Sequence, residues 1–296
     1  MAAPASAGTV DSLMLKVTPP RVPRHLVARR RLLSADDRLL AQPVILVQAP
    51  AGFGKTSLLA QWRREHLGRG AVVAWLSAQS NDDPGRLTQA LALAVRTGAA
   101  RPGFGHTLLA APPASASEAM TTWLAEVAQT ALDVVLIADE IDRLPPDSLE
   151  ALAYLLHNVP PNLRVVLAAR SDCRLDIDDL VDYGQCSVIG PSQLRFDLAE
   201  TIELVHSRLG ASVDHDAAAR LHDLAEGWPL GLQLALTVMS GGIDPKAEIA
   251  ALGAGGGLLR DQFVGVLLAN LDPDDLALLT RVSFVDALHP ALCAEL

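Results

Sequence analysis

The sequence predicts an α/β fold in which helices cover both faces of a parallel β-sheet, followed by a region built only of helices. Three observations support this prediction. Short β-branched runs alternate with helical patterns up to about residue 192. Only helical patterns follow that point. Half of the residues are hydrophobic and 20% are charged, a composition that provides enough apolar surface for a packed core.

Five short apolar runs are typical of strands that are buried on both faces of a sheet. They span residues 43–48, 71–77, 133–138, 163–169 and 186–189. Between them, helical patterns cover residues 55–66, 85–97, 117–127 and 147–157, and a loop rich in Gly, Pro and Ala covers 98–116. Strands that alternate with helices of this length form parallel sheets with helices on both faces.

The chain after Ile189 shows only helical patterns. Asp197 with Glu200 is a variant of the capping box and predicts a helix that ends near residue 209. Pro229 suits the first turn of a later helix, and the pair Gly241-Gly242 suits its end. The further helices are expected at residues 214–226, 229–239, 258–270 and 273–283.

These patterns divide the chain into four parts. Residues 1–20 are small and Pro-rich, and we expect them to form a flexible tail. The α/β domain covers residues 21–192, and a helical domain covers 193–257. The stretch from Gly253 to Gly257 is rich in glycine and precedes the fourth part, residues 258–296.

The charge balance and the cysteines argue against several classes of protein. With 24 basic and 34 acidic residues the net charge is −10, so the chain as a whole is a poor partner for nucleic acid or an anionic membrane. No apolar run predicts a membrane span or a signal peptide. Three widely spaced cysteines suit neither a disulfide framework nor a zinc site, so a cytoplasmic protein is expected. The Arg-rich start fits either a basic arm on an acidic body or a transit peptide.

The segment from Ala49 to Thr56 joins the first predicted strand to the first predicted helix and has the sequence APAGFGKT. It fits the phosphate-binding pattern G-x-x-x-x-G-K-[ST], except that Ala49 replaces the first glycine. Glycines let several backbone N–H groups approach one phosphate, and the helix N-terminus adds positive potential. At this composition the core of the pattern would arise by chance in on the order of one chain in a thousand. The alternative is a tight strand–helix turn with an incidental lysine.

Two side chains of this segment suit a nucleotide and its metal. Lys55 supplies a mobile point charge for the β- and γ-phosphates, and lysine is otherwise found only at Lys16 and Lys246. The Thr56 hydroxyl can ligate Mg²⁺, which prefers oxygen ligands. The sequence therefore predicts a site for ATP or ADP with Mg²⁺. Its phosphate-binding residues are Ala51, Gly52, Phe53, Gly54, Lys55, Thr56 and Ser57.

The third predicted strand ends in two carboxylates, Asp139 and Glu140. Open parallel sheets place their ligands at the carboxyl ends of the strands. We therefore expect Asp139 to hold Mg²⁺ and Glu140 to polarise the attacking water as a catalytic residue. Asp142 is either a further polar contact or a surface residue. On its own, the acidic pair would also fit a solvated start of a loop.

The fourth predicted strand is followed by Arg170, which would lie at the same edge of the sheet. A guanidinium fixed there can contact the γ-phosphate and respond to its loss. We therefore treat Arg170 as a second catalytic candidate, with an ion pair to a nearby acid such as Asp172 as the alternative.

Taken together, these residues resemble the signal-transducing P-loop ATPases with numerous domains, the STAND class. Within that class they resemble the large ATP-binding LuxR-type regulators typified by the maltose-regulon activator. The resemblance starts near Val17 and covers most of the chain. The matching segments are residues 43–59, 74–77, 81–84, 136–142, 166–170, 194–197, 226–234, 279–284 and 292–296.

The resemblance implies a P-loop NTPase fold with five parallel strands in the order 5-1-4-3-2, which brings Arg170 to the γ-phosphate. It implies that Pro229 lies against the adenine and that Arg29 lies beside the base. It also implies that residues 258–296 begin a winged-helix domain. Many relatives have a second aspartate in place of Glu140 and a histidine in place of Asp142. The family's inducer-sensing repeats and DNA-binding helix-turn-helix are expected outside this chain, so inducer and DNA would be reached only through such regions.

The preferred hypothesis is a nucleotide-operated switch of a LuxR-type transcriptional regulator. ADP holds the sheet and helical domains closed, ATP opens them and promotes self-association, and slow hydrolysis resets the switch. One alternative is a mechanical ATPase of the AAA+ kind, a loader or remodeller with an arginine from a neighbouring subunit. Another is a scaffold that keeps nucleotide bound without hydrolysis. No membrane partner is expected.

Overall fold

The computed structural model describes residues 13–22, 26–32, 42–110, 115–210, 213–240 and 273–283. The chain divides into two compact units, Met1–Phe196 and Asp197–Leu296. The helix expected at 258–270 and most of the expected fourth part lie outside the described residues. Among the described residues, no helix combines the length and the apolar character that crossing a bilayer would require.

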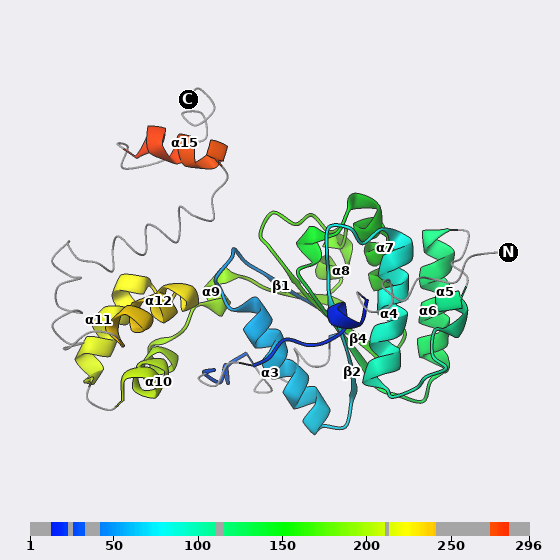
Figure 1. Ribbon diagram of the computed structural model, residues 1–296, viewed down its shortest axis with the longest axis horizontal. Coiled ribbons are helices and arrows are strands. Elements are labelled where there is room, and N and C mark those ends of the chain that lie inside the picture. Colours follow the sequence, from blue (N-terminus) through cyan, green and yellow to red (C-terminus); the bar gives the residue numbers. More distant parts are fainter. Residues whose placement is uncertain are drawn as a thin grey trace. The chain divides into compact units, whose positions relative to one another are not determined.

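A five-stranded parallel sheet forms the centre of the first unit (Figure 1). Its strands are β1 (Val44–Gln48), β2 (Val72–Ser77), β3 (Val134–Asp139), β4 (Leu163–Ala169) and β5 (Cys186–Ile189). They lie in the order β2-β3-β4-β1-β5, which confirms the expected order. In β1, Leu46 lies opposite Leu167 of β4 and Val188 of β5. Because β1 is paired with β4 on one side and β5 on the other, the segment that follows β1 leaves the interior of the sheet and not its edge.

Helices cover both faces of this sheet. Those of the first unit are α3 (Lys55–Gly68), α4 (Pro84–Gly98), α5 (His106–Ala110), α6 (Ala116–Gln129), α7 (Pro146–His157), α8 (Asp178–Asp182) and α9 (Pro191–Leu194), with the 3-10 turn η1 (Ile141–Arg143). Figure 1 shows α3 on one side of the sheet and α4, α6 and α7 on the other.

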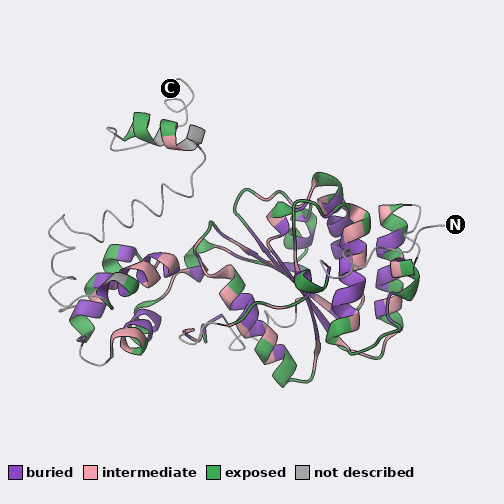
Figure 2. Cartoon of the chain, in the orientation of Figure 1, coloured by how far each residue is buried: buried purple, intermediate pink, exposed green. Residues whose placement is uncertain are grey.

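The strands are buried on both sides, as Figure 2 shows. Leu46, Leu136 and Leu167 belong to the core cluster shared with α4, α6 and α7. Their chain neighbours point to the opposite face because side chains alternate along a strand. These neighbours, such as Ile137, are buried as well, and α3 contacts β2, β3 and β4. Burial on both faces explains why the strands have continuous apolar sequences.

Local capping fixes where the helices begin. The Asp83 side chain accepts a hydrogen bond from the N–H of Arg86 at the start of α4, and Ser115 does the same for Glu118 in α6. The loop expected at 98–116 is wrong in part, because it contains α5 and the first residue of α6. With five residues, α5 is too short for a helical period to show in the sequence, although its Leu108 is buried.

The second unit is helical throughout its described part. It contains α10 (Leu198–Leu209), α11 (His215–Ala225), α12 (Pro229–Met239) and α15 (Pro273–Val282). The predicted capping box is present, because Asp197 Oδ1 accepts from the Glu200 N–H at 2.7 Å and Glu200 Oε2 accepts from the Asp197 N–H at 3.0 Å. Helices α10, α11 and α12 contact one another and bury Leu204, Leu221 and Leu232.

Residues 13–17 are not part of a loose tail, which corrects the expectation for residues 1–20. Residues 13–16 form a helical turn, and Leu13 and Val17 join the core cluster of the first unit. Between them, the Lys16 ammonium forms an ion pair with the Asp82 carboxylate, and both side chains are 0% exposed. The Asp82 carboxylate also accepts from the Gln79 N–H at 2.8 Å and from Arg86 Nε at 3.2 Å. The packing could not be predicted from the sequence of residues 1–20, because the partners of these residues, such as Asp82, lie far along the chain.

Replacing Lys16 with methionine is expected to lower the free energy of unfolding by about 3 kcal/mol, since removing one partner of a buried ion pair leaves the other charge poorly compensated. The loss is not expected to be larger, because the Asp82 carboxylate keeps its contacts with Arg86 Nε and with the Gln79 N–H. Urea unfolding followed by tryptophan fluorescence measures the effect. Leu15→Ala is the control, because Leu15 is 78% exposed in the same turn. Equal stability of the two variants would contradict the prediction.

Candidate functional site

The segment between β1 and α3 forms a phosphate-type loop. Gly52 and Gly54 have φ values of 80° and 78°, in the left-handed region that favours glycine. Gly54 is the N-cap of α3 and has no side chain with which to cap the helix, and the first turn contains no acidic residue. The free N–H groups and the helix dipole therefore favour an anion here. Between the two glycines, Phe53 is 9% exposed.

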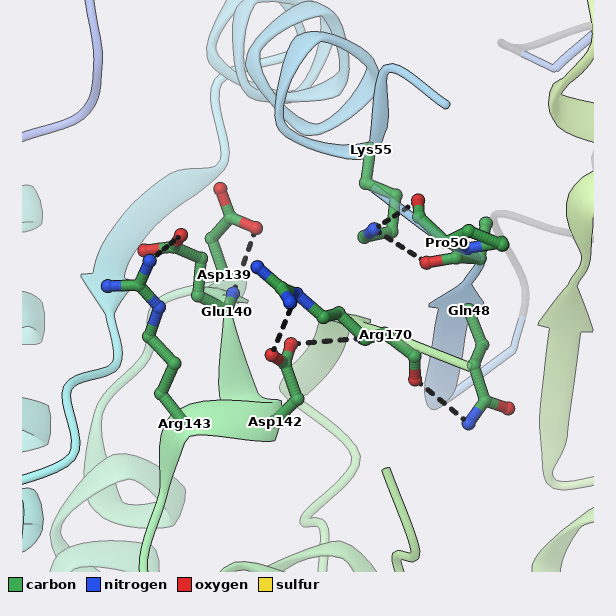
Figure 3. A network of polar contacts seen from close by, with 9 residues as sticks. Gln48, Pro50, Lys55, Asp139, Glu140, Asp142, Arg143 and Arg170 are labelled. Carbon is green, nitrogen blue, oxygen red and sulfur yellow. Dashed lines mark hydrogen bonds and ion pairs between the residues drawn. The ribbon is translucent and has the colours of Figure 1, made fainter. Parts of the chain in front are cut away.

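Lys55 folds back on this loop. Its Nζ donates to the carbonyl oxygens of Ala49 at 2.7 Å and Pro50 at 2.9 Å (Figure 3). Burial lowers the pKa of the Lys55 ammonium, although nearby carboxylates such as Asp142 oppose this shift. Two backbone carbonyls thus hold the ammonium against the loop.

Thr56 and Asp139 form the polar pair at the end of β3. The Thr56 hydroxyl donates to Asp139 Oδ2 at 2.6 Å, and the Glu140 N–H donates to Oδ1 at 2.9 Å. Asp139 is 4% exposed, and burial raises the pKa of its carboxyl group against the effect of these hydrogen bonds. A cation placed between the Thr56 and Asp139 oxygens would favour the ionised carboxylate. These oxygens are of the kind that Mg²⁺ prefers.

Glu140 lies next to this pair in an unusual backbone conformation. Its φ of 58° is left-handed, which few residues other than glycine adopt. The Glu140 carboxylate contacts the Arg143 guanidinium at 3.1 Å, and both side chains are exposed. Strained backbone of this kind is concentrated at functional sites, so the conformation marks Glu140 as a candidate for a role in the reaction.

Arg170 follows β4 and is held by Asp142 from η1. The Arg170 N–H donates to Asp142 Oδ1 at 3.0 Å, and Arg170 Nε lies 3.6 Å from Oδ2. The Arg170 side chain is 58% exposed, whereas that of Asp142 is 13% exposed. Behind Arg170, Gln48 Nε2 donates to the carbonyl oxygens of Arg170 at 3.3 Å and Cys173 at 2.9 Å. From the sequence, Asp142 is either a further polar contact or a surface residue, and no sequence pattern indicates a role for Gln48.

These elements enclose one cavity of about 230 Å³ at the carboxyl edge of the sheet. Most of the predicted site residues line it, together with Asp142. The lining residues are Ala51, Gly52, Gly54, Lys55, Thr56, Ser57, Asp139, Glu140, Asp142 and Arg170. Cations, backbone amides and carboxylates from three separate parts of the sequence therefore meet in one space. Figure 3 shows Lys55, Glu140 and Arg170 within this network.

Three of the predicted residues do not line this cavity. Phe53 belongs to the loop but is largely buried. Arg29 is 3% exposed and directs its guanidinium to the carbonyl oxygens at the end of α9. Pro229 is the first residue of α12 in the second unit. The expected contacts of Arg29 and Pro229 with the base stay predictions.

The comparisons with known proteins agree with this geometry. A family model described as an AAA domain matches residues 39–175. The chain is 27% identical over 284 residues to the HTH-type transcriptional regulator MalT of Yersinia enterocolitica, covering 92% of this chain and 30% of the relative. It is 28% identical over 264 residues to the serine/threonine-protein kinase PknK of Mycobacterium tuberculosis, covering 86% of this chain and 23% of the relative. The chain thus spans less than a third of the length of these curated relatives.

The solved structures that are similar to the chain include those of two further proteins. Cdc6p from Pyrobaculum aerophilum is 17% identical with a TM-score of 0.48, covering 78% of this chain and 65% of that one. The Orc1 protein of Aeropyrum pernix, in complex with DNA, is 15% identical with a TM-score of 0.47, covering 90% of this chain and 74% of that one. Residues 39–175 of the present chain thus match an AAA domain and contain the phosphate loop, and the chain is similar to part of a MalT transcriptional regulator.

Proposed function

We propose that the chain is an ATP-binding and slowly hydrolysing switch of the STAND class, within a transcriptional regulator of the LuxR type. One observation carries this proposal: a single cavity collects Lys55, the Thr56–Asp139 pair, Glu140 and Arg170 at the carboxyl edge of the sheet. Each of these groups suits one task in handling a triphosphate. The likeness to MalT supports the regulatory setting.

The residues present fit a nucleotide with Mg²⁺. Two left-handed glycines and the uncapped start of α3 leave backbone amides for phosphate oxygens. Thr56 and Asp139 provide hydroxyl and carboxylate oxygens for the metal. When bound, Mg²⁺ would supply positive charge that neutralises the phosphates. Lys55 exchanges its carbonyl partners, Ala49 and Pro50, for phosphate oxygens.

In the proposed reaction Glu140 orients a water molecule toward the γ-phosphorus and accepts a hydrogen bond from it. The water oxygen bonds to the γ-phosphorus, the bond from phosphorus to the β,γ-bridging oxygen breaks with its electron pair going to ADP, and one proton of the water is released, so that ADP and inorganic phosphate result. Arg170 contacts the γ-phosphate in the ATP state and returns to Asp142 when phosphate leaves. The Asp142–Arg170 pair supports this part of the proposal, because it gives the guanidinium a defined resting partner.

The proposed switch follows from the difference between the two nucleotides. ADP holds the α/β domain, residues 21–192, and the helical domain, residues 193–257, in a closed arrangement in which Pro229 lies against the adenine. ATP opens this arrangement and allows self-association, since only ATP engages Arg170. Residues 258–296 begin a winged-helix domain, and the protein acts in the cytoplasm. Inducer and DNA are bound by other regions of the regulator.

Sedimentation with different nucleotides tests the proposal. The purified chain is expected to carry ADP and to sediment as a smaller species than after exchange into a non-hydrolysable ATP analogue with Mg²⁺. Identical sedimentation in both states would contradict the switch. Fast turnover that polynucleotides stimulate would instead indicate a mechanical ATPase of the AAA+ kind. Absence of phosphate release over hours would indicate a scaffold that only holds nucleotide.

A further inference from the structure

Residues 27–32, here called the strap, cross α3 and contact it near its middle (Figure 1). The Gln61 side chain of α3 binds the strap twice: Oε1 accepts from the Arg29 N–H at 2.9 Å, and Nε2 donates to the Val27 carbonyl at 2.9 Å. One residue further along α3, Trp62 Nε1 donates to the Leu32 carbonyl at 3.0 Å. Because α3 starts at Lys55, the strap is attached to the helix that carries the phosphate loop.

The Arg29 side chain connects the strap to the end of the first unit. We call residues 193–196 the boundary segment, because the first unit ends at Phe196. Arg29 Nη2 donates to the carbonyl oxygens of Leu194 at 2.7 Å and Arg195 at 3.0 Å, and lies 3.4 Å from that of Gln193. Its guanidinium also lies 4.6 Å from the centre of the Phe196 ring. Three carbonyls and one aromatic face compensate a guanidinium that is 3% exposed.

A second contact joins the boundary segment to the phosphate loop itself. The Arg195 guanidinium lies 6.0 Å from the centre of the Phe53 ring, and the Arg31 guanidinium donates to the Arg195 carbonyl. Phe53 stands between two left-handed glycines, Gly52 and Gly54, that line the cavity. A change in the loop backbone on phosphate binding would shift the Phe53 ring and so alter its contact with the Arg195 guanidinium.

We propose that Arg29 is a positioning residue that ties the boundary segment to α3, and that the Phe53–Arg195 contact passes the state of the phosphate loop to that segment. This proposal rests on the proposed nucleotide binding. It gives Arg29 a different task from a contact with the base, because its Nη2 is directed to the α9 carbonyls. The site's occupancy would thus reach the chain at the point where the second unit begins.

Hydrogen exchange of a peptide covering residues 193–199 tests the proposal, with ATP affinity measured in parallel by calorimetry. In the unaltered chain, an ATP analogue with Mg²⁺ is expected to slow this exchange by about threefold or more. Arg29→Ala is expected to accelerate it about tenfold without nucleotide and to abolish the nucleotide effect, with ATP affinity changed by less than about threefold. Arg29→Lys keeps the charge but loses the planar fork, so an intermediate effect is expected.

Two further variants test separately the role of Arg29 and that of the Phe53–Arg195 contact. Arg30→Ala is the matched control, because Arg30 is the exposed neighbour in the strap, and it is expected to behave like the unaltered chain. Arg195→Gln removes the guanidinium from the Phe53 ring but keeps the backbone carbonyl that Arg29 contacts, so it is expected to retain ATP binding and basal exchange while losing the nucleotide effect. Thermal unfolding confirms that each variant is folded, and Arg29→Lys replaces Arg29→Ala if the latter does not fold.

The outcomes distinguish this proposal from the proposed function. If Arg29→Ala weakens ATP binding about tenfold and leaves the exchange of residues 193–199 unchanged, Arg29 is a nucleotide ligand and the proposal is wrong. If the unaltered chain binds no nucleotide, the proposed function is wrong, and so is the proposal that the Phe53–Arg195 contact passes the state of the phosphate loop to the boundary segment. The tie itself is then judged without nucleotide: faster exchange in Arg29→Ala but not in Arg30→Ala supports it, and equal exchange overturns it.

Discussion

Replacing Lys55 with alanine is expected to reduce the affinity for ATP about 100-fold, because the ammonium is the only lysine charge lining the cavity in the described residues. The substitution also removes two hydrogen bonds within the loop, to Ala49 and Pro50. Isothermal titration calorimetry with ATP and Mg²⁺ measures the loss. Because a charged hydrogen bond to phosphate is at stake, the lost binding free energy is about 2.7 kcal/mol.

Arg64→Ala is the control for this measurement. Arg64 lies on the same helix α3, is exposed and does not line the cavity, so its loss removes one positive charge without touching the site. We expect its affinity for ATP to stay within about twofold, since a remote surface charge is screened by salt. Unchanged affinity in Lys55→Ala would defeat the assignment of the phosphate loop and with it the proposed function.

Replacing Glu140 with glutamine is expected to slow hydrolysis about 100-fold or more while ATP affinity stays within about threefold. Glutamine has nearly the same shape and still accepts a hydrogen bond, but it lacks the negative charge that polarises water. Phosphate release in a single turnover measures the rate, and calorimetry measures the affinity. A drop in affinity without a change in rate would place Glu140 in binding instead of chemistry.

Glu150→Gln provides the matched control for Glu140→Gln. Glu150 is an exposed carboxylate on α7 and does not line the phosphate cavity. The two substitutions change the net charge equally, so any effect of overall charge on phosphate release appears in both variants. Only Glu140→Gln should slow the reaction. Equal rates in the two variants would show that hydrolysis in this chain does not depend on the Glu140 carboxylate.

The order of elements could be predicted because its signals are local. Strands buried on both faces are continuous apolar runs, and the phosphate loop, Asp139 and Arg170 each follow one of these runs directly. A parallel sheet brings the carboxyl ends of its strands together, so residues far apart in the sequence could be placed at one edge. The strand order itself came from the resemblance to a known family.

The contacts that could not be predicted are those that join distant segments by side chains. Lys16 meets Asp82, and Arg29 meets the carbonyls of residues 193–195, without any periodic pattern in either partner. The sequence around Arg29 shows three consecutive arginines that look alike. Only the fold distinguishes Arg29, which is buried, from Arg30, which is exposed.

The position of β1 between β4 and β5 has a consequence for how a ligand can leave. Peripheral strands fray first, because they have neighbours on one side only, whereas an interior strand opens late. The phosphate-binding loop directly follows such an interior strand, β1. Release of a bound nucleotide is therefore expected to require rearrangement of the loop that contains Gly52 and Gly54 and of the Lys55 side chain. Local opening of the edge strands would leave the phosphate-binding residues in place.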